Sequence, residues 1–391
     1  MASRPRTLAA STVGGVVVTA VLFWVSLAGL LWTQALYSLF AALVARLRPR
    51  PVRKGDITPT VTVIVAAHDE RAVIERRVEN LLALDYPPEL VEIVIASDGS
   101  TDGSDALVAA LAERHPQVRL LSGPRAGKVA AQNRAVRATT AEVIAFSDAN
   151  ARWEPDALRR LVANFADPDV AYVCGCLALE RADGSNREGV YWRFELWQRA
   201  SESTIGSITA GNGGIYAVRR SDYIETASHI GHDLGLPYRM AQRGRRAVYD
   251  PQAVAWEKPA RDSEDEFDRK IRMHAQIWRH VLSGDLLRGG GLLYLVEIVS
   301  HRVLRYASGI LHIVLLICSI ALAGDGLVYA SVLGAQLVWL LLALAGRLRL
   351  PVPGAALAYY YLLVIVATLA GLARYARTGV PVVWEKAEGT R

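Results

Sequence analysis

Long stretches of this 391-residue chain contain no charged side chain. Residues 7–45 have none, and the same holds for residues 306–324, 326–346 and 350–373. A helix that crosses a bilayer needs roughly 20 mostly apolar residues, so each stretch is about long enough. These runs exclude a chain that lies wholly in water. They predict one membrane helix before a charged central region and three after it.

Cysteine is also scarce, with three residues at positions 174, 176 and 318. Cys174 and Cys176 flank a glycine in a strand-like segment and lack further ligands at the spacing of a zinc site. We therefore expect reduced thiols with a structural role rather than a metal centre.

Basic residues flank the first apolar run unevenly. Arg4 and Arg6 precede it, and a larger cluster follows it: Arg46, Arg48, Arg50, Arg53 and Lys54. Positive residues favour the cytoplasmic side, so we expect a multi-pass protein of the inner (plasma) membrane with a cytoplasmic central domain. The run exceeds the roughly 7–15 apolar residues of a signal peptide, which favours a retained anchor. The basic residues lie beside the membrane segments, which favours the lipid bilayer over nucleic acid as their partner.

The sequence divides into four expected regions. These are residues 1–54 (membrane helix and basic flank), 55–284 (soluble domain), 285–305 (interfacial helix) and 306–391 (membrane bundle and short tail). The side of the C-terminus stays open. Three spans would place it outside, whereas Arg374, Arg377 and Lys386 favour the inside. Either the last segment is exported against its charge, or residues 286–300 dip into the membrane.

Short β-branched runs alternate with amphipathic stretches in the first half of the soluble domain. Strands are expected at residues 61–67, 91–96, 118–121 and 143–146. Such alternation predicts βαβ units and a parallel sheet, in which ligands sit at the carboxyl ends of the strands.

Acidic residues follow three of these strands. They are Asp69 and Glu70, Asp98, and Asp148, with Asn150 two residues further on. A single Asp after a strand is usually a turn former or a helix cap. Three acidic strand ends in one sheet instead indicate a bound hard cation, because converging carboxylates repel each other without one. Asp102 fits a helix cap equally well.

Several motifs, in this order, resemble those of glycosyltransferase family 2, whose members are inverting enzymes with a GT-A fold. Residues 63–70 (VIVAAHDE) resemble the first strand and its Ala-x-Asn-Glu signature, with Asp69 in place of Asn. Residues 96–102 (ASDGSTD) resemble the second-strand motif, and Gly127-Lys128 with Asn133 resembles the segment near the donor diphosphate. The resemblance implies an α/β domain with a Rossmann-like, mostly parallel mixed sheet, plus transmembrane helices. It extends to the membrane-bound branch that includes cellulose and poly-N-acetylglucosamine synthases.

The resemblance implies a nucleoside diphosphate-sugar donor, most simply a UDP-sugar. Its binding residues would be Ala67, Asp69, Glu70, Asp98, Lys128 and Asp148. Asp148-Ala149-Asn150 resembles the DxD metal motif, so Asp148 and Asn150 would bind Mg²⁺ or Mn²⁺. The cation would act as a Lewis acid on the leaving diphosphate.

The second half of the domain would supply the acceptor side. The Gly-rich segment with Asn212, Gly213 and Gly214, together with His232, resembles the family's acceptor-side elements. Asp233 falls where the family has its catalytic acid, so it would be the general base, although it also suits a helix cap. Glu70 and Glu202 are the next candidates for the base.

A cationic helix face is expected further along. Arg269, Arg272, Gln276 and Arg279 fall at spacings of three and four residues, and the last three would neutralise the leaving group. A face toward solvent or headgroups explains the same spacing. Tyr191, Trp192 and Trp197 offer either stacking on a sugar or packing against the membrane.

We therefore expect a membrane-bound inverting glycosyltransferase that acts on a lipid-linked or membrane-associated acceptor in envelope or exopolysaccharide synthesis. A nucleotidyltransferase would need no anchor, and a catalytically silent scaffold would not need these acidic residues. A processive polysaccharide synthase is the nearer alternative. Processive relatives carry Gln-x-x-Arg-Trp, whereas this chain has His280 in the position of the Trp. Imidazole offers less stacking area than indole, which favours transfer of a single sugar.

Overall fold

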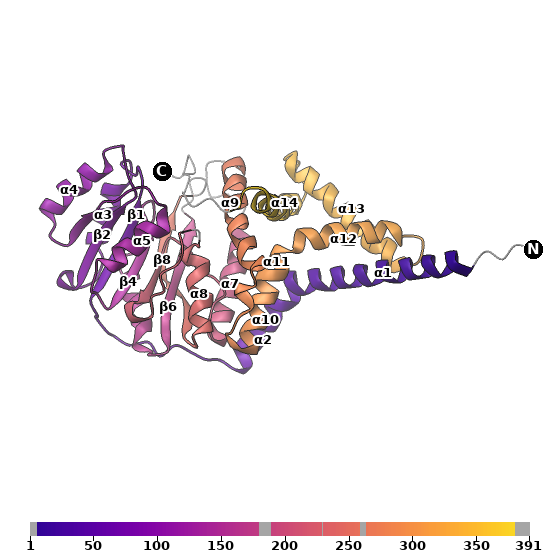
Figure 1. Ribbon diagram of the computed structural model, residues 1–391, viewed down its shortest axis with the longest axis horizontal. Coiled ribbons are helices and arrows are strands. Elements are labelled where there is room, and N and C mark those ends of the chain that lie inside the picture. Colours follow the sequence, from indigo (N-terminus) through magenta and orange to yellow (C-terminus); the bar gives the residue numbers. More distant parts are fainter. Residues whose placement is uncertain (1–5, 180–188, 229, 259–262, 380–391) are drawn as a thin grey trace, which may run out of the picture.

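The computed structural model describes residues 6–179, 189–228, 230–258 and 263–379. An α/β domain lies at one end of the molecule, and apolar helices from both ends of the chain lie at the other (Figure 1). Lys386 and the side chains of Tyr191 and Arg269 lie outside the described residues.

One eight-stranded sheet organises the domain, in the order β3-β2-β1-β4-β7-β6-β8-β5. The strands β3, β2, β1 and β4 are parallel neighbours, as the alternation predicts, whereas β7 is antiparallel to both β4 and β6. β8 pairs in parallel with β6 and antiparallel with β5. The bounds are β1 (Val61–Ala67), β2 (Val91–Ser97), β3 (Val118–Leu121), β4 (Val143–Asp148), β5 (Arg152–Trp153), β6 (Val170–Leu179), β7 (Tyr216–Arg219) and β8 (Arg246–Glu257).

Helices cover both faces of the sheet, which explains why its strands are continuously apolar. Val63 faces one layer, with Ile74 of α3, and Ile64 faces the other, with Ala131 of α5. All four side chains are fully buried, and a Val or Ile buried in this way contributes about 1.5–3 kcal/mol. The domain helices are α3 (Ile74–Leu82), α4 (Ser104–Arg114), α5 (Lys128–Arg137), α6 (Ala157–Ala163), α7 (Gly189–Ile205), α8 (His232–Gln242) and α9 (Ser263–Leu282).

Among the residues that the structure describes, three helices are long and apolar enough to cross a membrane. The first is continuous over Gly15–Leu47, where α1 (Arg6–Leu31) passes through the π-helical turn η1 (Trp32–Leu36) into α2 (Tyr37–Leu47). The others are α13 (Leu327–Arg347) and α14 (Ala355–Thr378). Each matches an uncharged run in the sequence.

The remaining uncharged run belongs to a bent helix pair. Gly291–Tyr306 and Ser308–Ala321 meet at 63°, and they make a fourth span only if the pair crosses as one unit. The first arm contains α10 (Gly291–Glu297), the π-helical η6 (Ile298–Val303) and α11 (Leu304–Tyr306). The second arm, α12 (Ser308–Ala321), packs along α1 through Leu315 against Phe23.

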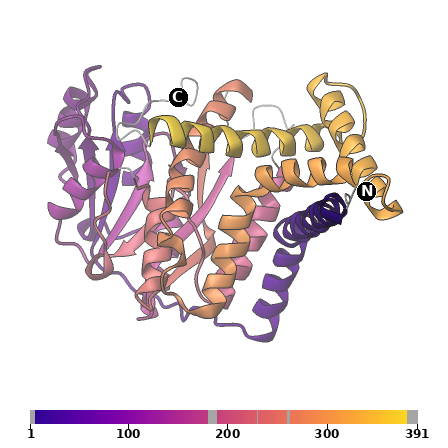
Figure 2. The ribbon, with the colours of Figure 1, turned by 45° about the vertical axis from the view of Figure 1, so that its right-hand side comes forward.

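The helix α14 lies crosswise to α1, as Figures 1 and 2 show from two directions. Its packing partner is α9 of the α/β domain. The Trp278 Nε1 donates to the Thr368 carbonyl at 2.8 Å, and a methyl group on Gly371 would lie 2.6 Å from the His274 Cβ. The middle of α14 is therefore covered by a charged helix. This arrangement differs from both alternatives given above for the C-terminus, which were an exported last segment and a dip of residues 286–300 into the membrane.

The basic cluster after the first span binds the protein rather than lipid at three positions. Arg50 pairs with Asp169 at 3.0 Å, Arg53 with Asp167 at 3.1 Å and Lys54 with Asp250 at 2.7 Å. These contacts attach the linker to the domain, while the side chains of Arg50 and Arg53 stay more than half exposed. Arg46 and Arg48 remain exposed next to the span.

Candidate active site

The acidic strand ends lie at one edge of the sheet. In the strand register Ala66 is level with both Ala96 and Asp148, and Ala67 is level with Ser97. The segments that follow β1, β2 and β4 therefore leave the sheet side by side. Parallel strands place their carboxyl ends together in this way, which is why the sequence could predict the edge.

Lys128 and Asp148 form an ion pair at the centre of this edge. Lys128 is the first residue of α5, and Gly127 before it adopts a φ of 95°, which favours glycine. Both side chains are about a quarter exposed, at 26% and 27%. Burial alone would lower the pKa of Lys128, but the carboxylates of Asp148, Asp233 and Glu257 outweigh it and raise the pKa. Lys128 is therefore a permanent cation beside the predicted metal ligand.

Asn150 lies two residues beyond Asp148, in the turn after β4, and is partly exposed. Within the part of the chain that the structure describes, no three His, Cys, Asp or Glu side chains cluster as a metal site. Asp148 and Asn150 supply hard oxygen atoms, which suit Mg²⁺ or Mn²⁺. Such an ion takes about six oxygen ligands, so this pair fits a cation that shares its remaining positions with a bound diphosphate and water.

Asp98 anchors the segment that leads to Lys128. Its carboxylate accepts hydrogen bonds from the amides of Ala126 at 2.7 Å and Gly127 at 3.0 Å. The side chain is buried, and its own amide donates to the Ala67 carbonyl at 2.8 Å. Asp98 and the buried Ala67 therefore shape the wall on which a donor would rest.

Asp69 and Glu70 occupy different environments. Asp69 has a φ of 50° and accepts a hydrogen bond from the Thr101 amide at 2.6 Å, while it stays 28% exposed. Glu70 is buried, with its amide bonded to Ser104 Oγ at 3.0 Å. Asp102 lies just before the N-cap residue Gly103 of α4 and accepts from the Ser104 amide at 2.9 Å and the Arg71 amide at 3.0 Å, so its contacts are structural.

The Gly-rich loop brings one glycine against the ion pair. A methyl group on Gly213 would lie 3.3 Å from Lys128 Nζ and 3.4 Å from Asp148 Oδ2. Asn212 is buried, and its Oδ1 accepts from the amides of Gly214 at 3.1 Å and Ile215 at 2.9 Å. Asn212 therefore holds the loop from within, and Gly213 is the residue that borders the site.

Asp233 is the second residue of α8 and is half-buried. A methyl group on Gly231 would lie 2.5 Å from Asp233 Oδ1 and 3.8 Å from Gln276 Oε1, so these two side chains border the same backbone. The Asp233 carbonyl also accepts from the Gly211 amide at 2.6 Å. The helix N-terminus stabilises a negative charge at this position.

His232, by contrast, points into the core. It is 4% exposed, with Nδ1 2.9 Å from Tyr216 Oη and Nε2 3.2 Å from Tyr223 Oη. Burial, helped by the charge of Lys128, lowers its pKa to about 3, so the ring is neutral. Its place favours a role in holding α8 rather than contact with an acceptor.

The predicted cationic face of α9 is brought to the site only in part. Gln276 borders Asp233 as described, and Arg272 and Arg279 lie one turn away on either side, partly exposed. His280 is buried against Tyr238, and burial, followed by the charges of Arg239 and Arg279, lowers its pKa to about 4.

Four further residues were expected at the site: Trp192 and Trp197 as aromatic contacts, and Glu70 and Glu202 as alternative bases. Trp192 Nε1 donates to the Leu177 carbonyl at 2.9 Å, whereas Trp197 is 44% exposed. Glu70 and Glu202 are 1% and 0% exposed, so neither faces an acceptor.

Arg77 is a residue near the site that the sequence argument missed. It is 2% exposed, donates to Ser147 Oγ at 2.7 Å and lies 5.2 Å from the Trp153 ring. Burial lowers its pKa to about 9 although the Asp148 charge opposes this. A signal existed, since Arg77 interrupts the apolar face that Ile74 and Val78 define on α3.

Comparisons with known proteins identify the family of the α/β domain. Residues 62–227 match the model of the family described as Glycosyl transferase family 2. A beta-monoglucosyldiacylglycerol synthase from Synechocystis sp. is 31% identical over 271 residues, which cover 66% of this chain and 50% of the relative. A poly-beta-1,6-N-acetyl-D-glucosamine synthase from Staphylococcus aureus is 23% identical over 223 residues, which cover 54% and 52%. The chain thus spans about half the length of these relatives.

Among solved structures, the mannosyltransferase PcManGT from Pyrobaculum calidifontis, in complex with GDP-Man and Mn²⁺, superposes with a TM-score of 0.72. The match has 23% sequence identity and covers 93% of this chain and 99% of that one. At this identity it establishes the shared fold. Residues 62–227 are therefore a domain of glycosyl transferase family 2, built on the GT-A fold and flanked by apolar helices that are able to span a membrane.

Proposed function

We propose that this protein transfers a sugar from a nucleoside diphosphate-sugar to a lipid-linked or membrane-associated acceptor, with inversion at the anomeric carbon. The observation that carries the proposal is the convergence of Asp148, Lys128, Gly213 and Asp233 at the carboxyl edge of the sheet. These residues would supply an oxygen ligand for a cation, a fixed positive charge and a carboxylate within one small region.

The donor diphosphate would bind between α5 and the turn after β4. Lys128 would exchange its contact with Asp148 for the diphosphate oxygens, and Asp148 with Asn150 would hold Mg²⁺ or Mn²⁺ against the same group. The bound cation supplies Lewis-acid stabilisation of the leaving diphosphate. The Asp98-anchored segment would support the nucleoside, and Gln276 with the arginines of α9 would approach the leaving group from the other side.

Asp233 would accept the proton of the acceptor hydroxyl as that oxygen attacks the anomeric carbon. Its carboxylate is half-buried and borders Gly231 and Gln276, on the side of the site that Gly211 and Gly213 line. Removal of the proton by a positioned base contributes on the order of 10²–10⁴ in rate.

The apolar helices favour an acceptor that resides in the membrane. The helix α9 carries Gln276 on one side and packs on α14 through Trp278 on the other, so the site and the membrane-associated helices share one element. A soluble acceptor would give no reason for this attachment. The names of the two relatives point to a lipid acceptor in one case and a polysaccharide in the other.

Transfer of a single sugar is the form we favour. His280 stands where a processive enzyme would have its acceptor-stacking Trp, and it is buried against Tyr238. The buried His280 ring is thus not accessible for stacking on a growing polymer.

The test uses purified full-length protein in lipid nanodiscs with a panel of UDP- and GDP-sugars. Release of nucleoside diphosphate that depends on a lipid acceptor supports the proposal, and product sizing should show one added sugar after long incubation. Release of pyrophosphate from sugar phosphate and nucleoside triphosphate would instead identify a nucleotidyltransferase. No turnover with any donor would favour a scaffold, and a ladder of products would identify a processive synthase.

A further inference from the structure

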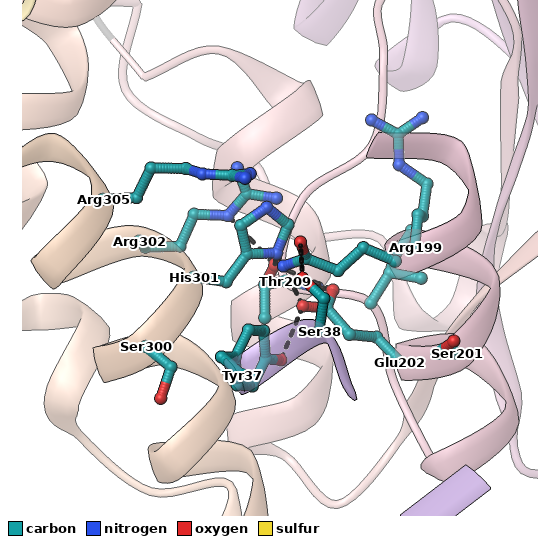
Figure 3. A network of polar contacts seen from close by, with 12 residues as sticks. Tyr37, Ser38, Arg199, Ser201, Glu202, Thr209, Ser300, His301, Arg302 and Arg305 are labelled. Atoms are coloured by element: carbon teal, nitrogen blue, oxygen red, sulfur yellow. Dashed lines mark hydrogen bonds and ion pairs between the residues drawn. The ribbon is translucent and has the colours of Figure 1, made fainter. Parts of the chain in front are cut away.

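A buried polar cluster joins the catalytic domain to both membrane regions. Figure 3 shows side chains from α2, α7 and the bent helix converging on Glu202, which is 0% exposed. Its Oε1 accepts from Tyr37 Oη at 2.8 Å and lies 2.6 Å from His301 Nδ1. Tyr37 belongs to the N-terminal span, and His301 belongs to η6, more than 260 residues later. One carboxylate oxygen therefore contacts both membrane parts of the chain.

The other oxygen of Glu202 holds the start of the active-site loop. Oε2 accepts from the Thr209 amide at 3.2 Å and from Thr209 Oγ1 at 3.0 Å. Thr209 Oγ1 also accepts from Arg302 Nε at 3.0 Å. Two residues later, the Gly211 amide donates to the Asp233 carbonyl, and Gly213 borders the Lys128–Asp148 pair. The backbone segment from Thr209 to Gly213 thus connects the Glu202 carboxylate to Asp233 and to the Lys128–Asp148 pair.

The energetics favour a fixed carboxylate at this position. Burial opposes the charge of Glu202, but the contact with His301 and the charge of Arg302 outweigh it and lower the pKa to about 2. A buried acceptor with four donors facing it is costly to remove, because each donor left without a partner costs about 1–3 kcal/mol. Glu202 therefore constrains the loop strongly.

We propose that Glu202 is a positioning residue for glycosyl transfer, which sets the Thr209–Gly213 segment according to the seating of the N-terminal and C-terminal membrane helices. The proposal rests on the proposed transfer reaction at this site. It gives the membrane helices a part in the alignment of the acceptor side, in addition to their role as anchors. A displacement of about 1 Å in such a segment costs up to about 10²-fold in rate.

Four variants separate positioning from a general loss of stability. Glu202→Ala removes every contact, and Thr209→Val removes the hydroxyl contacts but keeps the amide. Tyr37→Phe removes only the link to the N-terminal span. Glu195→Gln is the matched control, because Glu195 lies two turns earlier on the same helix. The variant weakens the ion pair with Arg305 and keeps an oxygen able to accept from His301 Nε2.

We expect Glu202→Ala to lower kcat by about 10²-fold with donor KM close to wild type, because the donor rests on β1, β2 and β4. Thr209→Val and Tyr37→Phe should give smaller losses of the same kind. Glu195→Gln should change kcat least. Equal losses in Glu202→Ala and Glu195→Gln, or a loss that appears only in donor KM, would overturn the proposal.

Hydrogen exchange supplies a readout that needs no activity. In nanodiscs, amides of residues 207–214 should exchange faster in Glu202→Ala, Thr209→Val and Tyr37→Phe than in the wild type or Glu195→Gln, while the core strands stay protected. Unchanged exchange in Thr209→Val and Tyr37→Phe would refute the coupling, even if Glu202→Ala failed to fold. A wild type that transfers no sugar would refute the proposed function instead, and the exchange comparison would still decide this inference.

Discussion

The Asp148 carboxylate forms an ion pair with Lys128 and would also bind the proposed cation, so the two compete for it. Replacement by Asn should therefore abolish metal-dependent turnover and leave Lys128 without its ion pair. We expect a loss of at least about 10²-fold in nucleoside diphosphate release, since transition-state charge on the leaving group would be uncompensated. The same loss should follow when EDTA is added to the wild type and should reverse with excess Mg²⁺ or Mn²⁺.

Asp156→Asn is the matched control for this change, because Asp156 makes an exposed helical ion pair with Arg160. It should retain full activity and full sensitivity to EDTA. Undiminished turnover of the wild type in EDTA would rule out the cation.

Asp233 should behave as the proton acceptor and not merely as a helix residue. Asp233→Asn keeps the size and the helix-terminal position but no longer takes up a proton at neutral pH. Activity should fall by about 10²–10⁴-fold, while the affinity for the donor, measured by calorimetry, should persist. Near-native transfer by this variant would exclude Asp233, and the burial of Glu70 and Glu202 means that neither would inherit the role.

The loop between α7 and β7 offers a test of which glycine serves the site and which serves the fold. An added methyl group on Gly213 meets Lys128 Nζ and Asp148, whereas one on Gly214 meets Leu177 Cδ1 at 2.8 Å. Gly213→Ala should therefore lower activity with little change in Tm. Gly214→Ala should lower Tm, because overpacking a core typically costs about 1–3 kcal/mol. The reverse pattern in a thermal and kinetic comparison would contradict the assignment of Gly213 to the site.

The sheet edge was predictable because it depends on local signals. A strand that ends at an acidic residue is visible in sequence, and parallel pairing then brings Asp98 and Asp148 to one edge. The ion pair of Asp148 with Lys128 follows from the same topology, since α5 connects to β4.

Contacts between distant segments were not predictable in this way. His232 looked available beside Asp233, yet Tyr216 and Tyr223 enclose its ring. The basic residues after the first span looked free for lipid, yet Asp167 and Asp169 from another element neutralise two of them. Sequence spacing describes one helix or strand at a time, and these contacts depend on how several of them pack.

The crossing of α14 over α9 predicts the side on which the described chain ends. Because the middle of α14 packs on Trp278 and His274 of the α/β domain, we predict that α14 lies along the membrane on the side of that domain and does not cross the bilayer. Arg374 and Arg377 would then stay inside, in accord with their charge. We expect a cysteine placed at Arg377, which is exposed, to react with a membrane-impermeant maleimide only after the cells are opened.

Asp325→Cys and Arg114→Cys are the controls, both at exposed positions. The first lies between α12 and α13 and should react in intact cells, and the second lies in the catalytic domain and should not. Each is compared with the wild type, whose own three cysteines set the background. Labelling of Arg377→Cys in intact cells would show that α14 crosses.

The meeting of Tyr37, Glu202 and His301 has a consequence for how the protein is made. The ribosome releases Tyr37 early, Glu202 midway and His301 only when most of the chain has been synthesised. Most of the GT-A domain is therefore synthesised before the partner that finishes its buried cluster. A nascent enzyme would stay idle until the translocon has delivered the late helices, so sugar donor would not be consumed by chains that have yet to settle in the membrane.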